Sequence, residues 1–148
     1  MKVIVLVRHG KSSWNFDVSD RNRPLKTRGI NDANLVASQF VKQNKIPEKI
    51  FSSPANRALS TCRIFSRHFN LSEKEIKIVE ALYDFGGDSV IEFIRALPND
   101  CDDIMIFGHN HAFTSSSPHG NTTQSSSIVT LTSTSVGHAP SVIEYIKV

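Results

Sequence analysis

Short apolar segments alternate with longer amphipathic segments along most of the chain, and this alternation limits the possible folds more than any other feature of the sequence. The strand-like segments are 3–7, 49–52, 75–79 and 103–107. The first is apolar throughout and the last is apolar after Asp103, which is typical of strands buried on both faces. Strands that alternate with helices form βαβ units. The sequence therefore predicts an α/β fold with three α/β/α layers and a mostly parallel central sheet.

Three segments between these strands have the periodicity of helices. They are 27–44, a segment that starts at Pro54, and 88–97. A proline suits the first turn of a helix because its missing N–H would have no partner there. In the first helix the apolar residues recur at helical spacing. These residues are Ile30, Ala33, Leu35, Val36, Ala37, Phe40 and Val41. We expect this apolar face to cover the sheet.

The last third of the chain differs from the rest, because residues 114–135 are rich in Ser and Thr. A fold of this type is expected to have a helix after the fourth strand. Pro118 and Gly120 disfavour a helix here, and Ser and Thr favour turns. We therefore expect an irregular segment. Strand candidates follow at 128–131 and 142–146.

Length, charge and cysteine content favour an ordinary intracellular domain. The chain has 148 residues, so we expect residues 1–148 to form a single domain. The formal net charge is only +3, without a run of Lys and Arg, which argues against a nucleic-acid partner. The two cysteines show no C-x-x-C spacing and no disulfide framework, which favours a reducing compartment. Without a signal peptide or a membrane-spanning segment, we expect a cytoplasmic protein with no membrane partner.

Cationic residues follow three of the predicted strands. The triplet Arg8-His9-Gly10 follows the first strand, the segment 53–58 follows the second, and the triplet Gly108-His109-Asn110 follows the fourth. In parallel α/β sheets, ligands bind outside the carboxyl ends of the strands. Two histidines and two arginines are thus expected at one edge of the sheet. Such a compact cationic site suits a phosphoryl group.

The residue types in these motifs match the needs of phosphoryl transfer. A phosphate monoester carries nearly two negative charges, and the planar guanidinium of arginine donates to its oxygens in bidentate fashion. Neutral imidazole is a nucleophile near pH 7, provided that an acceptor fixes its other nitrogen. A backbone carbonyl in the loop at Gly10 could be that acceptor for His9. Gly10 also allows the chain to turn close to the phosphate.

The motifs resemble those of the histidine phosphatase superfamily, the phosphoglycerate mutase-like group. The segments R-H-G-K-S-S-W (8–14) and D-x-x-R-P-L-x-x-R-G (20–29) are similar to its SixA-like phosphohistidine phosphatase branch. The resemblance covers residues 2–111. It implies that His9 is the nucleophile and becomes a phosphohistidine. It also implies that Arg8 and Arg57 clamp the phosphoryl oxygens, and that His109 contacts the same phosphate as a charged donor.

The group that protonates the leaving group is less clearly marked. Larger members of the superfamily use an acidic residue after the third strand, where this chain has Glu80. Asp17 and Asp20 are competitors for this role. We also expect Asp20 and Asn15 to bind substrate. A phosphoramidate P–N bond needs less help from an acid than an alkyl phosphate does, because its nitrogen can be protonated beforehand. A missing acid would therefore favour phosphohistidine as the substrate.

The resemblance implies a phosphatase that uses neither a metal nor an organic cofactor. Its substrate would be a phosphohistidine on a protein or a small phosphorylated molecule. One alternative is a phosphoglycerate mutase-like enzyme or a sugar-phosphate phosphatase. Another is a phospho-binding regulatory domain without activity, because the Ser/Thr-rich segment could spoil one wall of the site.

Overall fold

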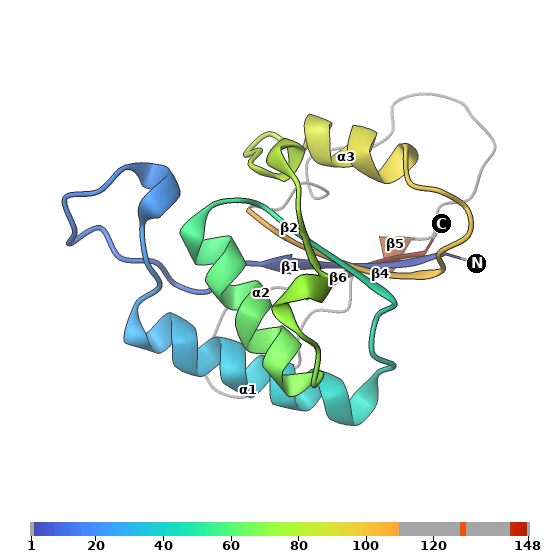
Figure 1. The fold of residues 1–148 in the computed structure, drawn as a ribbon, viewed down its shortest axis with the longest axis horizontal. Coiled ribbons are helices and arrows are strands. Elements are labelled where there is room, and N and C mark those ends of the chain that lie inside the picture. The colour runs from blue at the N-terminus through green and yellow to red at the C-terminus, as the bar shows by residue number, and fades with distance from the viewer. Residues whose placement is uncertain (1, 110–127, 130–142, 148) are drawn as a thin grey trace.

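The central sheet contains every strand of the chain that the structure describes. A computed structural model describes residues 2–109, 128–129 and 143–147. The strands are β1 (Val3–Arg8), β2 (Lys49–Ser52), β3 (Ile76–Ile78), β4 (Asp103–Gly108), β5 (Ile128–Val129) and β6 (Ile143–Lys147). Their order is β3-β2-β4-β1-β6-β5 (Figure 1). Strands β1 to β4 pair in parallel, and β6 pairs antiparallel with both β1 and β5. The mostly parallel sheet predicted from the sequence is confirmed.

Helices cover both faces of this sheet. The α-helices are α1 (Thr27–Gln43), α2 (Asn56–His68) and α3 (Asp88–Arg95). Short 3-10 turns occur at Asp20–Asn22, Glu73–Glu75 and Glu80–Leu82. Helices α1 and α2 lie on one face of the sheet and α3 lies on the other (Figure 1). The three α/β/α layers are therefore confirmed.

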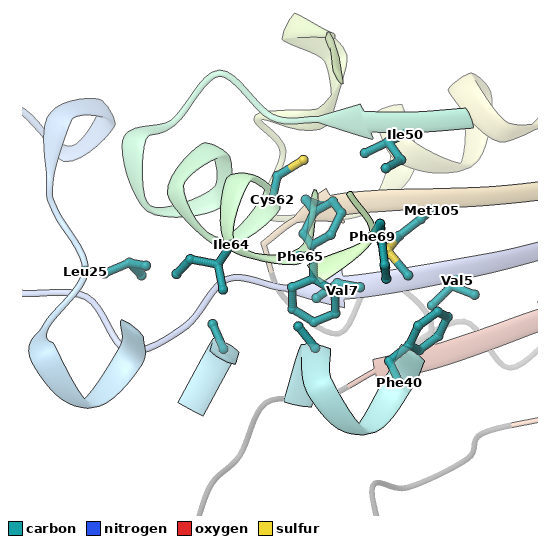
Figure 2. Packing of buried hydrophobic residues seen from close by; sticks show 13 residues of the cluster. Val5, Val7, Leu25, Phe40, Ile50, Cys62, Ile64, Phe65, Phe69 and Met105 are labelled. Atoms are coloured by element: carbon teal, nitrogen blue, oxygen red, sulfur yellow. The ribbon is translucent and has the colours of Figure 1, made fainter. Parts of the chain in front are cut away.

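The larger core cluster lies between the sheet and the α1–α2 layer. Figure 2 shows its aromatic and aliphatic side chains between the two helices and the strands. The ring of Phe65 lies 5.1 Å from that of Phe107 and 6.1 Å from that of Phe69. Each buried ring stabilises the fold by about 2–3 kcal/mol. On the opposite face, Phe51 of β2 packs against Phe93 of α3, with ring centroids 5.1 Å apart. These two clusters fix the strands whose ends carry the site.

The buried face of α1 is narrower than the sequence predicted. Only Gly29, Ala33, Ala37 and Phe40 are buried on this helix. Ile30, Leu35 and Val41, which we expected to face the sheet, are 41%, 41% and 37% exposed. A row of small residues brings the helix backbone close to its neighbours, so side chains at the edge of the stripe stay in solvent.

Helix α2 begins later than predicted. Its first helical residue is Asn56, and Ala55 is in extended conformation, so Pro54 precedes the helix and does not lie in its first turn. The hydroxyl of Ser53 accepts a hydrogen bond from the backbone N–H of Ala55 at 3.2 Å. This bond shapes a short extended link between β2 and α2.

The remaining predictions about the chain are settled only in part. The strand candidates 128–131 and 142–146 overlap β5 and β6. Most of the Ser/Thr-rich segment 114–135 lies outside the described residues, so the irregular structure expected there stays a prediction, as does the single domain. No helix in the described ranges is long and apolar enough to cross a membrane.

Candidate active site

The three cationic motifs meet at the carboxyl ends of β1, β2 and β4. Hydrogen bonds extend the sheet one step beyond these strands. The N–H of His9 donates to the carbonyl of Gly108 at 3.1 Å, and the N–H of Ser53 donates to that of Phe107 at 2.9 Å. The rings of His9 and His109 lie 5.3 Å apart. The parallel register of β1 and β4 therefore brings the two histidines side by side.

Hydrogen bonds at both nitrogens fix the tautomer of His9. Its Nδ1–H donates to the carbonyl of Gly10 at 2.7 Å, so Nε2 carries the lone pair. The Nε–H of Arg57 donates to this Nε2 at 3.2 Å. Burial lowers the pKa of His9 to about 4, and the charges of Arg57 and Arg8 add to this, while the bond to Gly10 opposes it. At neutral pH, His9 is an oriented and uncharged imidazole.

The loop that carries His9 is held against both α1 and α2. The N–H of Gly10 donates to the hydroxyl of Thr61 at 3.0 Å, and this hydroxyl donates to the carbonyl of Arg57 at 2.8 Å. A Cβ atom at Gly10 would lie 2.7 Å from the carbonyl oxygen of Gly29. Only glycine allows the loop to approach α1 this closely. The orientation of His9 is thus built into the contact between its loop and two helices.

Arg57 is the most buried charged residue of the site, and hydrogen bonds to Asp20 fix its guanidinium. Arg57 is 1% exposed. Its Nη1 donates to the carbonyl of Asp20 at 2.7 Å, and its Nη2 donates to the Asp20 carboxylate at 3.1 Å. The same carboxylate accepts from the hydroxyl of Tyr83 at 2.6 Å and from Nε of Arg23 at 3.0 Å. These bonds, that of Tyr83 above all, lower the pKa of Asp20 to about 2. Asp20 is therefore a fixed anion that orients Arg57.

His109 is buried beside His9. Its Nε2 lies 2.8 Å from the hydroxyl oxygen of Ser53, within hydrogen-bond distance. Its Nδ1 is buried and has no hydrogen-bond partner among the residues the structure describes. Burial, and then the charge of Arg57, lowers the pKa of His109 to about 3. His109 is therefore uncharged at neutral pH, and an anion beside it would favour the charged donor that the resemblance implies.

Arg8 and His9 line the same cavity, which has a volume of about 510 Å³. The cavity is lined by Arg8, His9, Gly10, Lys11, Ser12, Trp14, Lys26, Arg28 and Asp32. Arg8 is the last residue of β1, and His9 has already left the strand. Neighbours in a regular strand point to opposite faces, so this departure lets both side chains reach one cavity. The Arg8 side chain makes no hydrogen bond within the described ranges, which leaves its donors for a ligand.

A model of the histidine phosphatase superfamily (branch 1) matches residues 4–92. The chain belongs to this superfamily. Its fold is similar to the SixA protein of Agrobacterium tumefaciens, with 25% identity and a TM-score of 0.67 over 75% of this chain and 70% of that one. A SixA structure with bound tungstate gives 25% identity and a TM-score of 0.66, over 74% of this chain and 70% of that one. The SixA-like branch indicated by the sequence is therefore confirmed.

Two curated relatives of the chain are named as uncharacterized proteins. An uncharacterized protein of Mycobacterium tuberculosis is 27% identical over 103 residues, which are 70% of this chain and 62% of the relative. An uncharacterized chloroplastic protein of Arabidopsis thaliana is 27% identical over 116 residues, 72% of this chain and 53% of the relative. The chain thus spans about half to three fifths of the length of these relatives.

The acidic candidates of the sequence lie in different surroundings. Glu80 is 70% exposed in its side chain and binds Arg21 through two bonds, of 2.6 and 3.1 Å. This pairing lowers the pKa of Glu80, so it is an anion at neutral pH. Asp17 and Asn15 are exposed in the loop after β1. Within the described residues, their one hydrogen bond runs from the backbone N–H of Asn15 to the hydroxyl of Ser13, at 3.1 Å. None of these three side chains contacts His9.

Tyr83 and Ser53 belong to the site, although the sequence did not single them out for a role. Ser53 lies within the predicted motif 53–58, so its position was a signal. No sequence motif marked Tyr83 as a site residue, because only folding brings its hydroxyl to Asp20. Trp14 is 73% exposed, lines the cavity and lies under the guanidinium of Arg23 at 3.5 Å. It is therefore an aromatic of the cavity wall and not a core residue.

Because both site histidines are uncharged when folded, acid should destabilise the protein. We expect the free energy of unfolding to fall as the pH is lowered from about 6.5 towards about 4. The pKa values of His9 and His109 are about 4 and about 3 in the folded state, against 6.5 for an exposed histidine. The unfolded chain therefore binds more protons in this range, and stability rises with pH.

Denaturant unfolding at a series of pH values measures this dependence. His109→Gln removes one of the two titrating groups, so the slope of stability against pH should become shallower in the variant. The same slope in both proteins would show that His109 does not titrate with a lowered pKa.

Proposed function

We propose that the protein is a phosphatase that forms a phosphohistidine on His9. The observation that carries the proposal is the double hydrogen bonding of His9. Its Nδ1 is engaged by Gly10, so its lone pair is on Nε2, facing Arg57. A nucleophile needs an unprotonated, oriented nitrogen next to the groups that bind the phosphoryl oxygens. His9 has this arrangement and a pKa of about 4, so no proton has to be removed at neutral pH.

Three side chains would stabilise the transferring phosphoryl group. Arg8 and Arg57 supply two positive charges for a dianion. His109 would take up a proton near this anion, so that Nδ1 donates to a phosphoryl oxygen and Nε2 donates to Ser53. Fixed donors of this kind stabilise the charge of the transition state without reorganisation.

The reaction has two steps. In the first, the Nε2–P bond forms while the bond from phosphorus to the leaving group breaks on the opposite side. In the second, water attacks phosphorus, the Nε2–P bond breaks, and inorganic phosphate is released. His9 returns to its neutral form.

The charge state of the carboxylates favours a phosphohistidine substrate. Asp20 has a pKa of about 2, and the pKa of Glu80 is lowered by Arg21, so neither carries a proton at neutral pH. Neither is then a ready acid for an alkoxide leaving group. The imidazole leaving group of a phosphohistidine can be protonated by solvent before the bond breaks. The similarity to a structure named as the protein histidine phosphatase SixA supports the same substrate class.

Trapping of the intermediate tests the proposal. The full chain is incubated with an aryl phosphate and quenched in base, and the modified peptide is mapped by mass spectrometry. We expect an acid-labile phosphoryl group on the peptide that contains His9. Transfer of the group to a second position of the substrate would instead indicate a mutase. Binding of phosphate compounds without turnover would indicate a phospho-binding domain.

The proposed reaction takes its positive charge from protein side chains and not from a metal. Among the described residues, no three His, Cys, Asp or Glu side chains are grouped so that they could hold a metal ion. We expect the hydrolysis rate to be unchanged after incubation with a strong chelator. A loss of rate that added divalent cations restore would contradict this part of the proposal.

A further inference from the structure

The cavity beside His9 has a cationic wall that the proposed reaction does not use. Besides Arg8 and His9, the residues that line the cavity include Lys11, Lys26 and Arg28. In the proposed reaction, Arg8, Arg57 and His109 already stabilise the phosphoryl group. The wall of Lys11, Lys26 and Arg28, called the basic wall below, is therefore surplus to the binding of one phosphoryl group.

Backbone contacts hold the basic wall together. Lys11 lies in the loop after β1, and Lys26 lies just before α1. The N–H of Lys26 donates to the carbonyl of Lys11 at 2.8 Å, and a bridge joins Ser12 to Leu25. Two segments that are distant in the sequence are thus paired where both bear a lysine. The same loop carries His9, so the distance from the basic wall to the nucleophile is fixed by the fold.

Two of the three side chains of the basic wall carry a positive charge that no ion pair within the described residues compensates. The side chains of Lys11 and Lys26 are exposed and make no ion pair within the part of the chain that the structure describes. Among the described residues of the lining, Asp32 is the one acidic side chain, and it lies 3.8 Å from Arg28 in an ion pair. The described part of the lining therefore has four cationic side chains against one carboxylate. Clustered like charges repel one another, and a bound anion relieves that repulsion.

The cavity is large enough for more than a phosphoryl group. Its volume of about 510 Å³ lies within the range of roughly 300–1,000 Å³ that is usual for small-molecule sites. Trp14 adds an apolar surface to the same wall. A leaving group that fills this cavity would therefore share it with Trp14, Lys11 and Lys26.

We propose that the basic wall binds a second anionic group of the substrate, a phosphate or a carboxylate, while the transferable phosphoryl group lies against His9. This inference rests on the proposed function, because it takes His9 as the reacting end of the cavity. The preferred substrate is then a phosphorylated compound, or a phosphohistidine segment of a protein, that has a further negative charge close to the phosphoryl group.

Binding to the His9→Ala variant of the full chain tests the inference without turnover. The small-molecule probes are butane-1,4-diol bisphosphate and 4-hydroxybutyl phosphate, which differ only in the second anion. The peptide probes are two phosphohistidine peptides with glutamate or glutamine beside the phosphohistidine. We expect the probe with the second anion to bind about tenfold more tightly in at least one pair, and the preference to shrink as ionic strength rises.

A charge-matched pair of variants locates the preference. Lys11→Gln with Lys26→Gln should abolish it and leave the affinity for the singly phosphorylated probe nearly unchanged. Lys42→Gln with Lys74→Gln removes the same net charge from exposed positions outside the cavity lining, and should leave the preference intact. The pair of probes that shows the preference, small-molecule or peptide, tells whether the second anion belongs to a small molecule or to a protein.

Equal affinities within both pairs of probes would overturn the inference. So would a preference that survives in the Lys11 and Lys26 variant. Failure of the proposed function has a different signature, because the wild-type protein would then bind the probes with this preference and form no phosphohistidine.

Discussion

Replacement of His9 by alanine should lower kcat/KM for an aryl phosphate by at least about 10⁴-fold, the scale of loss seen when a catalytic nucleophile is removed. The reason is that Nε2 of His9 is the unprotonated ring nitrogen, and a hydrogen bond from Arg57 orients it. Arg8, Arg57 and His109 remain in the variant, so an inert phosphate analogue should still bind. Steady-state kinetics and the phosphoenzyme assay measure the two properties separately.

His68→Ala is the matched control for this prediction. His68 is the last residue of α2, and its Nε2 lies 3.0 Å from the side-chain oxygen of Asn34. It has the same chemistry as His9 but lies outside the site, so its loss should leave kcat/KM nearly unchanged. Equal rates for wild type and His9→Ala, with both proteins folded by circular dichroism, would remove His9 as the nucleophile.

The fold was predictable because burial leaves a strong mark on sequence. A strand that is covered on both faces is expected to be apolar along its buried length, and residues 3–7 of β1 and 104–107 of β4 have that pattern. The edge at which their carboxyl ends meet then follows from parallel pairing. This is why His9 and His109, one residue beyond each strand, could be expected together before the structure was known.

The roles of the acidic residues were not predictable in the same way. The sequence allowed Asp20 to be an acid, a substrate ligand or a loop residue, because nothing local fixes the partners of an exposed-looking carboxylate. In the structure two of its partners, Tyr83 and Arg57, come from distant parts of the chain, and Arg23 lies three residues away. Such contacts depend on how loops cross the edge of the sheet, which residue periodicity does not encode.

The exposed residues of α1 show a second limit of sequence patterns. Helical periodicity tells which residues share a side of the helix but not how wide the covered stripe is. The width depends on how closely the neighbours approach, and here Gly29, Ala33 and Ala37 allow close approach along a narrow line. Apolar residues at the edges of this line then remain in solvent.

The second large effect is expected for Arg57→Lys, which keeps the charge and removes the planar fork. Arg57 donates in three directions at once, from Nε to His9, from Nη1 to the carbonyl of Asp20 and from Nη2 to its carboxylate. A lysine ammonium is a single point at the end of a flexible stem and cannot reproduce that geometry. We expect kcat to fall by about 10²–10³-fold, as when an oriented transition-state donor is lost.

The control for Arg57→Lys is Arg63→Lys, the same exchange elsewhere on α2. Arg63 pairs with Glu73 at 3.2 Å on the more exposed side of the helix, so its replacement should leave the rate within about twofold. Thermal unfolding separates a catalytic loss from a general loss of structure, because Arg57 is buried and its replacement also carries some cost in stability. If Arg57→Lys kept full kcat, charge alone would suffice at this position. The fixed network from Asp20 through Arg57 to His9 would then serve the fold and not the chemical step.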